Sequence, residues 1–157
     1  MIEFHYETEF AFQDVGGFQV IEEAKVQHQA QYESELADWV SRVINSEGFD
    51  KGAITYIFCA DEYLWELNKK HLKHDTLTDI ITFDYTVGRQ VSGDIFISVD
   101  RVKENAKKYK TNLGNEILRV MSHGLLHLFG YKDKSESDQS EMRGKEDEKI
   151  KLFHVEQ

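Results

Sequence analysis

Hydrophobic and polar positions repeat along the chain with two different periods. Residues 2–6 alternate apolar and polar side chains, which is the period of a half-buried strand. Residues 29–47 instead repeat apolar side chains at helical spacing, and Gly48 follows as a stop signal. The run 53–60 is rich in β-branched and aromatic residues. These patterns predict a strand, a helix and a second strand, in that order.

The middle of the chain continues the mixture of helices and strands. Asp61 is placed to cap a helix that begins directly after the second strand. Residues 79–85 and 94–99 are rich in β-branched and aromatic side chains, so they predict two further strands. The segment between them contains Gly88 and Gly93 and predicts a turn.

The rest of the chain is predominantly helical in its pattern. Residues 100–110 predict a basic helix or turn, and Asn112 can cap a long helix that runs to Phe129. Gly130 lies where a helix-ending residue with positive φ is expected. Residues 138–153 are charged with a thin apolar edge, which predicts a surface helix. Strands mixed with helices indicate an α+β fold, a small mixed β-sheet packed with helices.

Composition and charge narrow the class of protein. The chain has 157 residues and a formal net charge of −10, so we expect one hydrolase-like domain over residues 1–157 without a broad basic surface. Cys59 is the only cysteine, lies in an apolar run and is expected to be a buried thiol. The start of the chain lacks a signal-peptide pattern, and no apolar run reaches the length of a membrane span. We therefore expect a cytoplasmic location and no membrane partner.

Residues 122–134 carry the strongest chemical signal. His123 and His127 are four residues apart on the predicted helix and therefore project from one face. The other faces of this helix are apolar, which indicates a helix buried at the centre of the fold. Two buried imidazoles need partners that offset their desolvation, and one divalent metal ion would be such a partner. The alternative is that both are hydrogen-bonded core histidines.

A third metal ligand has to come from outside this helix face. Gly130 ends the helix and lets the chain turn back, which places Asp133 best to complete the site. Glu136 or Asp138 would replace it if the loop is longer. Catalytic zinc sites typically use three protein ligands. The pattern therefore predicts one divalent ion, with zinc as the preferred metal, held by Asp133 and the two histidines.

The spacing is similar to that of the metzincin proteases, with one difference. Those enzymes place a glutamate, the general base, directly after the first histidine. The corresponding residue in this chain is Gly124. A metallopeptidase is therefore the weaker alternative, and another metal-dependent hydrolase is favoured.

Residues 123–131 also carry a longer motif, His-Gly-x-Leu-His-Leu-x-Gly-Tyr. Upstream, Leu-Asn at 67–68, Thr-Asp-Ile-Ile-Thr-Phe at 78–83 and Gly-Asp-Ile at 93–95 occur in order. Over roughly residues 53–150 these motifs resemble those of the YbeY family of bacterial endoribonucleases, also called rRNA maturation factors.

The resemblance implies a single-strand-specific, metal-dependent endoribonuclease that acts in rRNA maturation and ribosome biogenesis. Its substrate would be RNA, as an rRNA precursor, and its partners would be ribosomal subunits or ribosomal proteins. Three positions depart from the family pattern, because Asp133 replaces a histidine, Leu72 an arginine and Leu77 a proline. Loss of an arginine that could hold phosphate favours, as an alternative, a metal-stabilised ribosome-assembly factor with little catalysis.

Cationic residues around position 72 can partly replace the missing arginine. The resemblance places this run beside the metal cleft, so Lys70 and Lys73 are candidates for binding RNA phosphate. His71 and His74 have the chemistry of an acid or base, although no spacing selects either one. A second basic run, at residues 101–110, is expected to be a solvated face.

Overall fold

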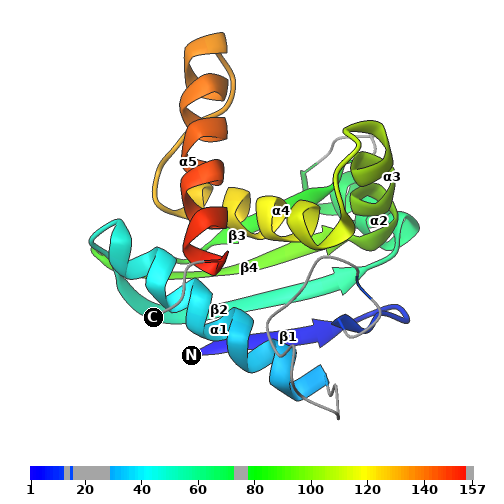
Figure 1. Cartoon of the computed structure of the whole chain (residues 1–157), viewed down its shortest axis with the longest axis horizontal. Coiled ribbons are helices and arrows are strands. Elements are labelled where there is room, and N and C mark those ends of the chain that lie inside the picture. The colour runs from blue at the N-terminus through cyan, green and yellow to red at the C-terminus, as the bar shows by residue number, and fades with distance from the viewer. Residues whose placement is uncertain (13–14, 16–28, 73–77, 155–157) are drawn as a thin grey trace.

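The computed structural model describes residues 1–12, 15, 29–72 and 78–154. Within these ranges a four-stranded sheet has the order β1-β2-β4-β3, with helices packed around it (Figure 1). The strands are β1 (Ile2–Tyr6), β2 (Asp50–Cys59), β3 (Ile80–Asp84) and β4 (Gln90–Ser98). The helices are α1 (Gln29–Ser46), α2 (Asp61–Leu72), α3 (Val99–Lys108), α4 (Leu113–Leu128) and α5 (Glu136–His154).

The sheet is mixed, as the sequence predicts. β1 and β4 both run parallel to β2, whereas β3 is antiparallel to β4. The register places Tyr56 beside Ile95 and Phe58 beside Ile97, so these large apolar side chains project to the same face. β4 begins at Gln90, earlier than predicted, because it pairs with β2 along most of its length.

The two glycines that were expected in one turn have different roles. Gly88 has a φ of +60° and lies in the turn between β3 and β4. Gly93 instead lies inside β4, where an added Cβ would come within 2.7 Å of the Phe83 carbonyl oxygen and 3.0 Å of the Leu128 side chain. The turn prediction is therefore wrong for Gly93, because close packing of the strand against its neighbours requires the glycine.

The two faces of the sheet carry separate apolar clusters. α1 and α4 pack on the face that contains Tyr56 and Ile95, and their side chains form the main core. α2 packs on the other face, where Leu64 and Phe96 belong to a smaller cluster. β4 therefore separates the two clusters by alternating its side chains between them.

α4 is the central helix of the fold, as its apolar surround predicts. It contacts β3, β4 and the helices α1, α3 and α5. At its start the Asn112 side chain accepts a hydrogen bond from the Asn115 backbone N–H at 2.8 Å. At its end Gly130 has a φ of +105°. Both ends of α4 therefore lie where the sequence predicts them.

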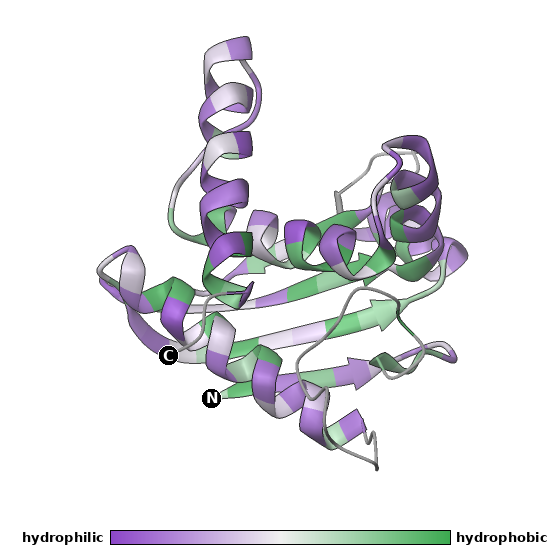
Figure 2. Ribbon diagram, viewed as in Figure 1, coloured by the Kyte–Doolittle hydropathy of each residue, from purple (hydrophilic) through white to green (hydrophobic). Residues whose placement is uncertain are grey.

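α5 is only partly the surface helix that the sequence predicts. Figure 2 shows it as largely hydrophilic, and it rises away from α4 (Figure 1). None of the helices within the described ranges is long and apolar enough to cross a membrane. Yet Met142, Glu146 and Lys149 are only 2%, 5% and 0% exposed. Because these three residues recur at helical spacing, α5 turns one charged face inward against α4 and α1.

Candidate metal centre

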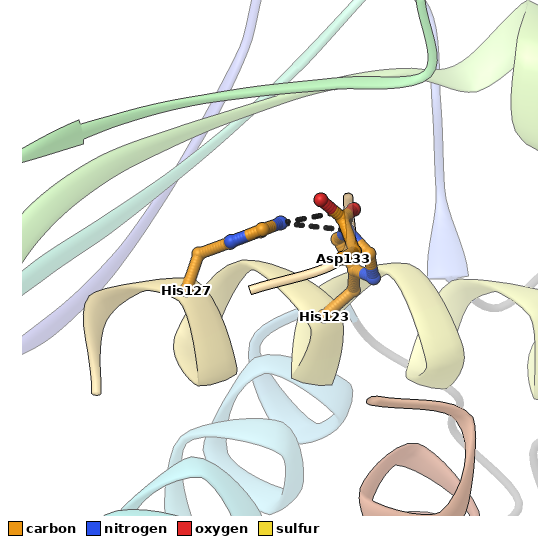
Figure 3. A group of neighbouring side chains, drawn as sticks. All are labelled: His123, His127 and Asp133. Atoms are coloured by element: carbon orange, nitrogen blue, oxygen red, sulfur yellow. Dashed lines mark hydrogen bonds and ion pairs between the residues drawn. The ribbon is translucent and has the colours of Figure 1, made fainter. Parts of the chain in front are cut away.

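The three predicted metal ligands converge near the C-terminal end of α4. His123 and His127 project from this helix, and Asp133 follows in the loop before α5 (Figure 3). The two histidine Nε2 atoms lie 3.0 Å apart. The Asp133 Oδ2 atom lies 3.2 Å from Nε2 of His123 and 3.3 Å from Nε2 of His127. One ligand atom from each residue therefore lies within 4.8 Å of the others.

The donor set fits a divalent metal ion. Two imidazole nitrogens and a carboxylate oxygen are ordinary ligands of zinc and of several other transition metals. All three side chains are half-buried, so the group is both shielded and reachable from solvent. Glu136 and Asp138, the alternative third ligands, do not belong to this group. His123, His127 and Asp133 could therefore hold one metal ion.

A buried carboxylate contacts the outer nitrogen of His123. Glu146 Oε2 lies 2.6 Å from His123 Nδ1, and Glu146 is 5% exposed. The Arg119 guanidinium donates to Glu146 Oε1 at 2.9 Å, which balances the charge of the carboxylate. His127 is held in a similar way, because its Nδ1 lies 3.1 Å from the Tyr131 carbonyl oxygen. Such contacts orient a ligating ring and leave its Nε2 atom facing the metal position.

Sequence reasoning did not find Glu146. It lies 23 residues after His123, on a helix whose sequence is charged almost throughout. The available signal was its spacing from Met142, because a residue four positions after a buried apolar residue shares the same helix face. That signal predicts burial of Glu146 but does not identify its partner.

The surroundings of His123 favour a cation at this ring. Burial alone would lower the pKa of His123, but the hydrogen bond and charge of Glu146, with the charges of Asp133 and Asp79, outweigh burial and raise it. A proton and a metal ion compete for the same nitrogen. The same carboxylates therefore favour metal binding once the pH is high enough to remove the proton.

A second cluster of charges holds the loop that carries Asp133. The Tyr131 hydroxyl donates to Glu47 Oε1 at 2.7 Å, and Lys149 and Lys145 donate to Glu47 Oε2 at 2.6 Å and 3.2 Å. Burial raises the pKa of Glu47, but the hydrogen bonds from these three residues outweigh it and lower the pKa. The end of α1, the loop and α5 are therefore tied together, which restricts the movement of Asp133.

Two cavities meet at the candidate metal group. The larger, of about 610 Å³, is lined by all three ligands and by Asn68 and the start of β3. The smaller, of about 350 Å³, lies between α4 and α5 and is lined by His123, Asp133 and several charged side chains. The metal position is therefore accessible from two sides, one of which is strongly polar.

Asp79 lines both cavities, although the sequence motif that contains it predicted no role for this residue. Its Oδ2 atom accepts a hydrogen bond from the Asn105 side chain at 3.4 Å. Burial raises the pKa of Asp79, while the charge of His123 acts in the opposite direction. Asp79 is therefore a carboxyl group that faces both cavities without belonging to the three-residue ligand group.

Only two of the residues predicted to bind phosphate or to act as acid or base, Lys70 and His71, lie in the described ranges. Lys70 and His71, at the end of α2, are exposed and line neither of the two cavities. Their predicted roles in phosphate binding and acid–base chemistry remain predictions. The other positions discussed in this region lie outside the described residues: the side chain of Leu72, and Lys73, His74 and Leu77.

Gly124 bears directly on the peptidase alternative. An added Cβ at this position would come within 2.9 Å of Ile95 and 3.0 Å of Ile80, so the helix packs closely on β3 and β4 there. The position faces the sheet and has no space for a glutamate that would act as a general base. The structure therefore argues against a metzincin-like mechanism, in agreement with the sequence.

Comparisons with known proteins agree on one family. The family model described as "Endoribonuclease YbeY" matches residues 19–154, so the match begins well before the first motif identified in the sequence. A protein of Flavobacterium johnsoniae named Endoribonuclease YbeY is 52% identical over 157 residues, which cover 100% of both chains. A protein of the same name from Flavobacterium psychrophilum is 48% identical and is covered over 99% of its length.

A solved structure is similar in fold. The solution structure of TM1509 from Thermotoga maritima has a TM-score of 0.64 to this chain at 23% sequence identity. The similarity covers 98% of this chain and 89% of that chain. It supports the mixed sheet and the arrangement of helices described above.

Proposed function

The chain belongs to the YbeY family of endoribonucleases, and from this membership we propose that it is a single-strand-specific, metal-dependent endoribonuclease of rRNA maturation. The observation that carries the proposal is the convergence of His123, His127 and Asp133 where two cavities meet. A metal-dependent hydrolase needs a metal ion that polarises the bond to be cleaved and that the substrate can reach. This arrangement of ligands and cavities meets both requirements.

The three residues would hold one divalent metal ion, with zinc as the proposed metal. Such an ion supplies Lewis-acid chemistry at a phosphodiester. Glu146 and the Tyr131 carbonyl hold the two histidine rings so that both Nε2 atoms face Asp133. Asp133 brings a negative charge where the family pattern has a neutral histidine, so this chain's site is less positive than the family's usual one.

RNA would reach the metal position through the larger cavity. Its walls contain the polar side chains of Asn68, Thr78 and Thr82, which can hydrogen-bond to ribose or phosphate oxygens. Lys70, exposed at the end of α2, would contact phosphate farther along the strand. Because its partners would be rRNA precursors and ribosomal subunits or proteins, we propose a cytoplasmic site of action.

The deciding experiment compares the wild type with His123→Ala on a single-stranded oligonucleotide derived from rRNA, with metal content measured in both preparations. We expect cleavage by the wild type and a loss of at least about a hundredfold in the variant, because two ligands cannot hold the metal in place. A double-stranded version of the same sequence should resist cleavage.

Two other outcomes are informative. Equal cleavage by both preparations would identify a contaminating nuclease. Salt-sensitive binding of RNA by the metal-loaded wild type, without cleavage, would contradict the proposal and favour a metal-stabilised ribosome-assembly factor.

A further inference from the structure

Glu116 is a buried carboxylate whose oxygens meet no donor within the described part of the chain. It lies near the start of α4 and is 5% exposed. No hydrogen bond or ion pair joins its side chain to another described residue, although Glu146, equally buried in the same cavity, has two partners. Every fully enclosed side-chain oxygen in the described residues has a partner, so the Glu116 oxygens must retain some accessible surface.

The accessible surface of Glu116 lies in the smaller of the two cavities at the metal group. Glu116 lines this cavity of about 350 Å³ together with His123 and Asp133, and it also lines an adjoining cavity of about 450 Å³. Burial raises the pKa of Glu116, with the charges of Arg119 and Arg143 acting in the opposite direction. An exposed glutamate would interact equally well with the start of the helix, so helix stability does not explain its burial.

The same cavity contains a guanidinium group that no described residue binds through a hydrogen bond or salt bridge. Arg119 is occupied, because it donates to Glu146 and to Asp147. Arg143, one turn before Glu146 on α5, has no salt bridge or hydrogen bond to another residue in the described ranges and also lines both cavities. Among the described residues, this cavity, which His123 and Asp133 also line, thus presents a carboxylate and a guanidinium that interact through their charges but have no hydrogen bond or salt bridge.

This pair of groups is complementary to one nucleobase. Guanine has two adjacent donors, N1–H and the N2 amino group, that a carboxylate can accept together, and its O6 and N7 atoms are acceptors for arginine. Adenine, cytosine and uracil each place an acceptor beside the donor on the corresponding edge. Tyr109, which also lines both cavities and is 55% exposed, offers an aromatic face for stacking a base.

We propose that the cavity between α4 and α5 is a guanine-binding subsite, in which Glu116 accepts from N1–H and N2 and Arg143 donates to O6 and N7. The inference rests on the proposed function, because the guanine would belong to the RNA strand next to the phosphodiester at the metal. It adds a base preference to the site, so cleavage occurs at a fixed distance from a guanosine.

The test uses short single-stranded RNAs that contain one guanosine, or inosine or 7-deazaguanosine at the same position. Inosine lacks the N2 amino group, and 7-deazaguanosine lacks the N7 acceptor. We expect wild-type kcat/KM to be about tenfold lower with each analogue than with guanosine. Glu116→Gln should remove the preference over inosine, and Arg143→Gln the preference over 7-deazaguanosine. Glu104→Gln, which changes an exposed glutamate of α3, should keep both preferences.

Binding of mononucleotides separates this proposal from the proposed function. Calorimetry on the metal-loaded wild type should show tighter binding of 5′-GMP than of 5′-IMP or 5′-AMP, whether or not RNA is cut. Tighter binding of GMP without cleavage would support the subsite and contradict the endoribonuclease proposal. Cleavage with equal rates for guanosine and inosine, together with equal affinities for the mononucleotides, would overturn the subsite alone. The wild-type comparisons remain decisive if Glu116→Gln does not fold.

Discussion

Helices α5 and α2 both carry charged side chains, but they place those charges differently relative to the candidate metal centre. α5 buries Glu146 and Lys149, which are 5% and 0% exposed, and each has a charged partner. α2 leaves Lys70 and His71 in solvent, away from the walls of the two cavities at the metal group. α5 packs on α4, whereas α2 packs on the opposite face of the sheet.

The difference in burial between the charges of α5 and those of α2 implies different roles for the two helices. Breaking a buried ion pair leaves an uncompensated charge and costs about 3–5 kcal/mol, whereas an exposed pair is worth about 0–1 kcal/mol. The charges of α5 can therefore fix the geometry of the metal ligands. The charges of α2 can attract a polyanion but cannot hold a ligand in position.

The largest effect is expected from Lys149→Met. This substitution keeps an apolar stem but leaves Glu47 without its closest cation, so the free energy of unfolding should fall by about 3 kcal/mol. Urea unfolding followed by circular dichroism measures the change. Lys151→Met, which alters an exposed lysine of the same helix, is the control and should stay within about 0.5 kcal/mol of the wild type. Equal losses of unfolding free energy in the two variants would contradict a difference in stability contribution between buried and exposed charges.

Glu146→Gln should weaken metal binding. The amide cannot supply the negative charge that faces His123 Nδ1, so we expect metal affinity to fall by about 10- to 100-fold. Competition with a chromogenic chelator measures the affinity, and Glu141→Gln on the exposed side of α5 is the matched control. An unchanged affinity would show that Glu146 serves packing alone.

The Glu47 cluster predicts a pH dependence of stability. The pKa of Glu47 is lower in the folded protein than in the unfolded chain, so its contribution is present above the unfolded value. The contribution is lost as the pH falls through the lowered folded value. The difference in unfolding free energy between wild type and Glu47→Gln should therefore shrink on acidification from neutral pH. A difference that stays constant over this pH range would contradict a lowered pKa of Glu47 in the folded protein.

The smallest effect is expected from Lys70→Ala. If Lys70 contacts a phosphate, its removal should lower RNA affinity a few-fold. The slope of log affinity against log salt concentration should become shallower by about one. The metal affinity and the free energy of unfolding should be unchanged, in contrast to those of the α5 variants. Fluorescence anisotropy with a labelled RNA at several salt concentrations gives both quantities. A large loss of metal affinity would show that α2 also shapes the centre.

The parts of the site that were predicted from sequence depend on local patterns. Asn112, the apolar periodicity of α4 and Gly130 define one helix, and this helix fixes the relation between His123 and His127. A short loop then restricts where Asp133 can lie. Each of these relations spans few residues, so tertiary packing had little opportunity to override them.

The parts that were missed depend on contacts between distant segments. Glu146 meets His123 only because α5 docks on α4, and neither the docking nor its register can be read from a charged helix. Gly93 looked like a turn residue because the packing of Leu128 against it is visible only in three dimensions. The resemblance motifs marked residues 78–83, but the position of Asp79 between two cavities required the fold.

The docking of α5 also sets the order in which the protein matures during its own synthesis. Glu146, Lys145 and Lys149 lie in the last helix of the described chain, so they leave the ribosome after both histidines and Asp133. Until then His123 lacks its carboxylate partner, and Glu47 lacks its two lysines. Because the chain is synthesised from its N-terminus and a domain generally folds as a unit, a growing chain carries its ligands before it can hold them. An enzyme that cuts ribosomal RNA would thus acquire a formed centre only after α5 has emerged from the ribosome that makes it.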